Sequence, residues 1–218
     1  MKSILANKIF TRFVFSMEIK NCQNSSTFQS RIVVLSPERF NKTVNRMRDG
    51  LRNFDCIYEY DLDIKEGSKA YRTNVDNIVT EGVRSCTAVV KANKGSKAPL
   101  VAHIRNSEEN LKRLYLLDTP NECTNAILIG SKRFYKKSSE VFDAIMRKAK
   151  NVPTTIMKGL KLRWEAQIAF NSKKDTLYLC VNEINNKRPK YAKNMKDLKS
   201  CFDKFVISSE DKIEFLTK

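Results

Sequence analysis

The strongest constraint on the fold is an alternation of apolar residues in the second half of the chain. Every second position from 160 to 170 is apolar, namely Leu160, Leu162, Trp164, Ala166, Ile168 and Phe170. A period of two is that of a β-strand with one buried face. Polar residues at Asn171–Asp175 predict a turn, and Thr176–Ile184 predicts the returning strand. This half of the chain therefore favours an antiparallel hairpin.

Helical signals precede and interrupt the strands. Ser36-Pro37-Glu38 combines a capping hydroxyl, a first-turn proline and an acid, and apolar residues follow it at helical spacing. Ser107 and Ser138 are predicted to cap two further helices, the second running from Val141 to Lys150. Other strands are expected at Val83–Lys91, Pro99–Ile104 and Ala126–Ile129. The mixture predicts an α+β fold, with a mixed or antiparallel, sandwich-like sheet and helices packed on it.

The length of the chain limits the number of domains, and its charge limits the kinds of partner. A chain of 218 residues suits one domain spanning 1–218, with the lysine-rich residues 185–218 as a candidate basic appendage. The net charge of +17 favours encounter with nucleic acid, an anionic membrane or an acidic protein surface. As partner we expect a protein substrate with an acidic surface, with nucleic acid second. No apolar stretch reaches the ~20 residues of a membrane span. Lys8 and Arg12 interrupt the apolar N-terminus, so no clear signal peptide is expected. We expect a cytoplasmic protein, or an effector secreted into a target cell.

Cysteine and histidine usage narrows the chemistry. No two of the six cysteines lie within three residues of each other, which argues against a zinc knuckle or a redox pair. We expect reduced, mostly buried thiols and neither a metal nor a cofactor. His103 is the only histidine, so a mechanism that needs imidazole must use it.

The order of residues predicts that Cys86 and His103 meet. If Lys94-Gly95 form the centre of a hairpin turn, the two residues lie opposite each other on one face of the sheet. A slip of one residue would separate them onto opposite faces. A neighbouring imidazole can deprotonate a thiol and later return the proton to a leaving amine. The pair therefore predicts nucleophilic catalysis.

A family resemblance adds Thr80 to the pair. The segment Thr80-Glu-Gly-Val-Arg-Ser-Cys86-Thr-Ala-Val-Val90, followed by His103, resembles the site of the CheD-like chemoreceptor glutamine deamidases. The cytotoxic necrotizing factors and the Burkholderia lethal factor family share that Cys-His core and fold. The resemblance covers roughly Val79–Val181 and implies a CheD-like fold, with Cys86 as nucleophile, His103 as base and Thr80 orienting the base. Arg84 and Ser85 stand where the family has glycine beside the cysteine.

The expected function is that of an enzyme, a protein-glutamine deamidase acting on a target with an acidic surface, in the manner of a bacterial effector or toxin. One alternative is a basic nucleic-acid- or ribosome-binding module without catalysis. Another is a cysteine protease or transamidase that uses the same pair. A buried cysteine or a lone histidine is more often structural when taken separately. The joint spacing with Thr80 favours catalysis.

Overall fold

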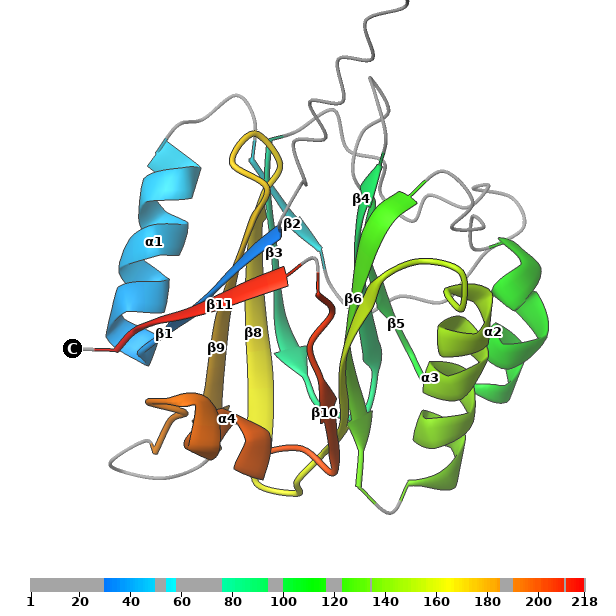
Figure 1. Cartoon of the computed structure of the whole chain (residues 1–218). Helices are drawn as coiled ribbons and strands as arrows, with labels where there is room; N and C mark the ends of the chain where they lie inside the picture. The colour runs from blue at the N-terminus through cyan, green and yellow to red at the C-terminus, as the bar shows by residue number, and fades with distance from the viewer. Residues whose placement is uncertain are drawn as a thin grey trace, which may run out of the picture.

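Two β-sheets face each other, and helices cover their outer faces (Figure 1). The computed structural model describes residues 30–49, 54–57, 76–93, 100–116, 123–133, 135–184, 190–209 and 211–217. The expected α+β class with a sandwich of mixed sheets is confirmed in these residues. The N-terminal residues 1–29, and with them the predicted lack of a signal peptide, lie outside the described part.

The first sheet has six strands. Their order is β11 (Asp211–Leu216), β1 (Ser30–Leu35), β9 (Thr176–Glu183), β8 (Trp164–Asn171), β3 (Asn77–Val83) and β2 (Phe54–Ile57). β1 runs parallel to both of its neighbours, whereas β8 runs antiparallel to β9 and β3. The predicted hairpin is thus confirmed as β8–β9. Its first strand begins at Trp164, however, because Leu160 ends another strand and Leu162 is an exposed turn residue.

The second sheet has five strands. Their order is β10 (Lys204–Val206), β7 (Thr154–Leu160), β6 (Cys123–Lys132), β4 (Thr87–Asn93) and β5 (Leu100–Ile104). β6 and β7 are parallel, and the other pairs are antiparallel. The connection between β4 and β5, where the Lys94-Gly95 turn is predicted, lies outside the described residues.

Four α-helices flank the sheets in the described residues: α1 (Pro37–Asp49), α2 (Glu108–Arg113), α3 (Lys136–Lys148) and α4 (Met195–Ser200), with a 3₁₀ turn at Leu114–Leu116. Ser107 caps α2, as predicted, by accepting a hydrogen bond from the backbone N–H of Asn110. The predicted cap of α3 is wrong. Tyr135 is the N-cap, and Ser138 lies inside the first turn, where its hydroxyl has other partners.

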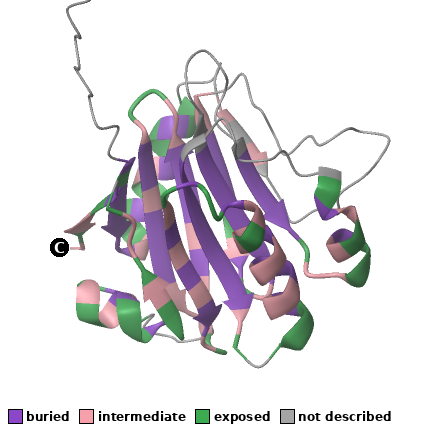
Figure 2. Ribbon diagram, turned by 45° about the vertical axis from the view of Figure 1, so that its right-hand side comes forward, coloured by how far each residue is buried: buried purple, intermediate pink, exposed green. Residues whose placement is uncertain are grey.

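Apolar side chains fill three separate layers, which explains why many strands are buried on both faces (Figure 2). The largest cluster lies between the sheets and includes Ile78, Ala88 and Val101. A second cluster joins the second sheet to α3 through Phe142 and Ile145. α1 covers the first sheet with a third cluster that includes Phe40. The result is a four-layer arrangement of helix, sheet, sheet and helix.

A buried polar cluster links the two sheets. Asn125 of β6 donates to Ser30 of β1 and to Oδ1 of Asp211 of β11. The Asp211 carboxylate also accepts from the hydroxyl of Thr155 in β7. Two strands of each sheet are therefore joined by buried hydrogen bonds, which are costly to break because their partners would be left unsatisfied.

The C-terminal segment supplies an edge strand to each sheet. β10 pairs with β7, and β11 pairs with β1 along its whole length. Composition marks residues 185–218 as a candidate appendage, but the described part of this segment contributes a strand to each sheet. Residues 185–189, 210 and 218 lie outside the described residues. None of the helices in the described residues is long and apolar enough to cross a membrane.

Candidate active site

The chain crosses from the first sheet to the second at the turn Arg84–Cys86. A single strand from Val83 to Lys91 was the expectation, and it is wrong: β3 ends at Val83 and β4 begins at Thr87. Gly82, with φ of +70°, lies where the pairing of β3 with β8 shifts register. Among described residues other than glycine, Ser131 and Asp175 alone have positive φ. The turn at Arg84 and Ser85 therefore forms without the glycine of the resembling family.

The thiol of Cys86 and the imidazole of His103 meet behind this turn. Ala88 is the residue that pairs with His103 across β4 and β5, so the register differs by two residues from the predicted one. A shift of two keeps both side chains on the same face of the sheet. Sγ of Cys86 lies 2.6 Å from Nε2 of His103. The predicted proximity is confirmed, with Cys86 as a diagonal neighbour of His103 instead of a directly paired one.

Thr80 contacts the other nitrogen of the same ring. Its Oγ1 lies 2.7 Å from Nδ1 of His103. Thr80 belongs to β3 in the first sheet, and His103 belongs to β5 in the second, so the three side chains meet between the sheets. Thr80, His103 and Cys86 are 0%, 1% and 2% exposed. The structure therefore brings together all three residues that the sequence singled out.

Burial sets the protonation state of the imidazole. Desolvation lowers the pKa of His103 to about 4, so the ring is neutral at neutral pH and can accept a proton. Nε2 accepts from the thiol only when the ring proton is on Nδ1. In that tautomer Nδ1 donates to Oγ1 of Thr80, which can act as the acceptor.

The other described thiols have different surroundings. Burial raises the pKa of Cys180 and of Cys201 to about 12. Both are free thiols and buried, as expected for structural cysteines, and Cys56 is half-buried. Cys22 and the side chain of Cys123 lie outside the described part of the chain. Since His103 is the only histidine, Cys86 alone among the four described thiols has an imidazole partner.

Hydrogen bonds from β6 and α3 fix the turn that carries Cys86. The Ser138 hydroxyl donates to the carbonyl of Ser85 (2.5 Å) and accepts from the backbone N–H of Lys132 (2.8 Å). The backbone N–H of Ser131 donates to the carbonyl of Cys86 (3.1 Å). Asn106 also donates to Ser138, at 2.9 Å. The carbonyls of Ser85 and Cys86 are thus both held by groups distant in sequence.

Gly130 allows β6 to approach this turn. Its φ is +133°, and a Cβ at this position would collide with the carbonyl oxygen of Cys86. Sequence reasoning missed the roles of Ser138 and Gly130. Ser138 stands near a helix start, so its position in the sequence predicts a cap. Its contacts with Ser85 and Lys132 arise from tertiary packing, which no local sequence pattern shows.

The chain matches no protein-family model and no curated protein, so the geometry of this site carries the functional argument.

Proposed function

We propose that the protein is a protein-glutamine deamidase in which Cys86 is the nucleophile, His103 the general base and acid, and Thr80 the residue that orients His103. The observation that carries the proposal is the contact of both ring nitrogens, one with the thiol at 2.6 Å and one with a hydroxyl at 2.7 Å. A nucleophile, a base within reach and a third group that orients the base form the minimal arrangement for covalent acyl transfer.

The first half of the reaction forms a thioester. Nε2 of His103 takes the thiol proton, and the Cys86 thiolate attacks the carboxamide carbon of a glutamine side chain. The tetrahedral intermediate collapses when Nε2–H gives its proton to the leaving nitrogen, which departs as ammonia. The glutamine acyl group is then bound to Cys86. General acid–base catalysis of this kind contributes about 10²–10⁴-fold in rate.

The second half restores the enzyme. His103, again neutral, takes a proton from water, and the hydroxide attacks the thioester carbonyl. The carbon–sulfur bond breaks, the Cys86 thiolate recovers the proton from Nε2, and the product is a glutamate side chain. The cycle consumes one water and releases one ammonia, and no metal or cofactor takes part.

Several features of the chain suit this reaction. The sandwich with helices on its outer faces is compatible with the CheD-like fold that the resemblance implies. A net charge of +17 favours encounter with a target whose surface is acidic. A lysine- and asparagine-rich composition suits a bacterial effector or toxin that acts inside a target cell, and we extend the proposal to that role.

The test is mass spectrometry of a cell lysate incubated with the purified protein. The proposal predicts glutamine-to-glutamate conversion at specific sites, release of ammonia, and loss of both with Cys86→Ser. That change is nearly isosteric, but a hydroxyl is far less acidic than a thiol. Cys180→Ser is the matched control, because it exchanges another buried thiol and should leave the conversion intact.

Other products would identify the alternatives. Incorporation of an added amine at the same glutamines indicates a transamidase, since the thioester is then captured by a different nucleophile. Cleavage of the backbone indicates a protease. If neither a side chain nor a backbone is altered in any lysate, and Cys86→Ser keeps the biological effect, the basic binding module replaces the enzyme.

A further inference from the structure

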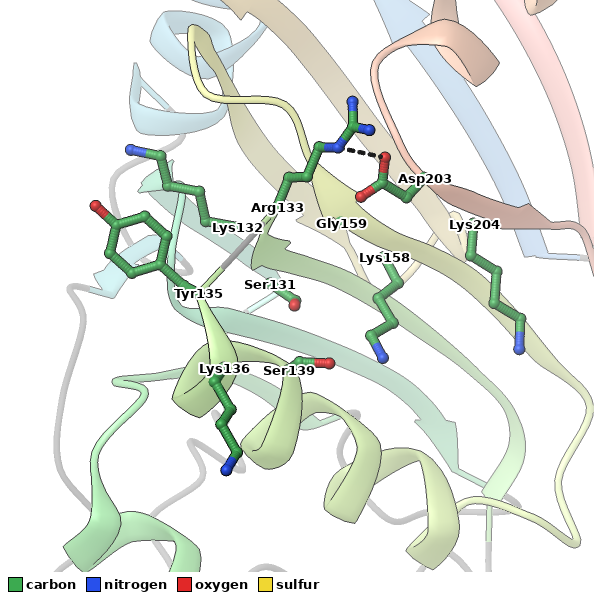
Figure 3. A pocket seen from close by; sticks show the side chains of 10 residues that line it. All are labelled: Ser131, Lys132, Arg133, Tyr135, Lys136, Ser139, Lys158, Gly159, Asp203 and Lys204. Carbon is green, nitrogen blue, oxygen red and sulfur yellow. Dashed lines mark ion pairs between the residues drawn. The ribbon is translucent and has the colours of Figure 1, made fainter.

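A positively charged cleft of about 450 Å³ opens next to the start of α3 (Figure 3). Its walls come from the end of β6, the start of α3, β7 and the start of β10. The cleft and the Cys86 turn share one stretch of backbone. Ser131, which lines the cleft, donates its N–H to the carbonyl of Cys86, and Lys132 donates its N–H to Ser138, which holds Ser85.

The lining is strongly cationic. It includes five lysine or arginine side chains and a single acid, Asp203. Arg133 pairs with Asp203 at 3.4 Å, and Lys158 pairs with Asp143 at 2.7 Å. Lys132 and Lys204 have no acidic partner among the described residues. α3 adds to the field, because its N-terminus faces the cleft with no acid in the first turn and no side-chain cap.

The cleft also contains a buried hydroxyl that lacks a partner. Ser131 is 1% exposed, and its Oγ has no hydrogen bond within the part of the chain that the structure describes. Figure 3 shows this side chain among the lysines that surround the cleft. Buried hydroxyls almost always have a partner, because leaving one unsatisfied is costly. A bound acceptor would satisfy this hydroxyl in a cleft that is lined by cationic side chains.

We propose that this cleft binds acidic side chains of the protein substrate and so positions the target glutamine at Cys86. The proposal rests on the deamidase function and locates its substrate-docking site. A carboxylate fits better than a nucleic acid. Tyr135 is the one aromatic residue of the lining, which is little for stacking bases.

The probe for this docking site is a fluorescent hexaglutamate peptide, whose binding to the full chain is measured by anisotropy. A hexaserine peptide is the neutral comparison. Hexaglutamate should bind, and its affinity should fall as salt rises. Lys132→Gln with Lys204→Gln should weaken binding about three- to ten-fold, since two exposed charge contacts are lost. Lys42→Gln with Lys174→Gln removes two charges remote from the cleft and should have little effect.

Ser131→Ala tests the cleft without changing charge. It should weaken hexaglutamate binding about five-fold through the loss of one hydrogen bond, while the melting temperature shows whether the fold is intact. Failure of hexaglutamate to bind, or an equal loss in the remote lysine pair, would overturn the proposal. It would also be wrong if single-stranded DNA of equal charge bound more tightly and lost its affinity in the Lys132/Lys204 pair.

The docking proposal and the enzymatic one can fail separately. Cys86-dependent deamidation of lysate proteins without hexaglutamate binding would contradict the docking site and support the deamidase function. Hexaglutamate binding that depends on Lys132 and Lys204, with no deamidation in any lysate, would support an acid-binding cleft and contradict the deamidase function.

Discussion

The hydroxyl of Thr80 lies 2.7 Å from Nδ1 of His103, while the thiol of Cys86 lies at the other nitrogen of the ring. The two strands that carry Thr80 and His103 belong to different sheets. The orientation of the His103 imidazole therefore depends on the packing of the two sheets against each other.

Thr80→Val should lower the rate of deamidation by about ten-fold, less than the roughly 10²–10⁴-fold loss expected for His103→Ala. Valine has nearly the same shape but cannot accept from Nδ1–H, so the base is misoriented and not removed. Thr176→Val is the control, since it removes another buried hydroxyl on a strand of the same sheet. Equal rates for Thr80→Val and Thr176→Val would contradict the role of Thr80.

The pH dependence of stability should show the low pKa of His103. Burial lowers the pKa to about 4 in the folded chain, below its value of about 6.5 in the unfolded chain. The folded state binds fewer protons, so stability is fully present above about pH 6.5 and is lost as pH falls toward 4. His103→Gln lacks this titration. Between about pH 7 and about pH 5, the free energy of unfolding of the wild type should fall by about 2 kcal/mol more than that of the variant.

Urea unfolding of both proteins at a series of pH values measures this difference. The difference between wild type and His103→Gln reports the titration of His103 alone, because the chain has no other histidine. Parallel curves for the two proteins would show that the pKa of His103 is the same in the folded and unfolded states.

Ser138→Ala should slow deamidation while leaving most of the fold intact. The Ser138 hydroxyl holds the carbonyl of Ser85, so its loss frees the turn that presents the thiol. We expect a fall in kcat of about ten-fold with little change in KM, and a loss of stability of about 1 kcal/mol. Ser200→Ala is the control, since Ser200 also donates to a backbone carbonyl, but in α4. An unchanged kcat would show that Ser138 has a structural role alone.

Gly130→Ala should have a larger effect on the same turn. A side chain at Gly130 meets the carbonyl of Cys86 and requires an unfavourable φ, so both the β4–β6 pairing and the turn must shift. Backbone strain of this kind costs on the order of 1–3 kcal/mol. Gly82→Ala is the comparison, because Gly82 also has positive φ but a Cβ there meets nothing within 4 Å. The melting temperature should fall further in Gly130→Ala than in Gly82→Ala.

Local sequence patterns predicted the elements whose signals are local. The β8–β9 hairpin, helix α1 and the cap of α2 at Ser107 were all evident from periodicity and capping chemistry. The face shared by Cys86 and His103 was predicted although the register was wrong by two residues, because an even shift preserves the face.

The missed features depend on contacts distant in sequence. Strand β1 is buried by neighbours on both faces, so it lacks the alternation that identified β8. The turn at Arg84–Cys86 contains no glycine or proline to mark it, and it is held instead by Ser131 and Ser138. The cationic cleft draws its lining from four elements, and no stretch of sequence contains it.

Site-resolved alkylation measures whether His103 activates the thiol of Cys86. The full chain is treated with iodoacetamide at neutral pH, and the rate at each cysteine is followed by peptide mass spectrometry. Cys86 should react faster than Cys180 and Cys201, whose pKa values are raised by burial to about 12. The rate at Cys86 alone should fall markedly in His103→Ala. Equally slow labelling of all three thiols, unchanged by His103→Ala, would show that His103 does not activate Cys86.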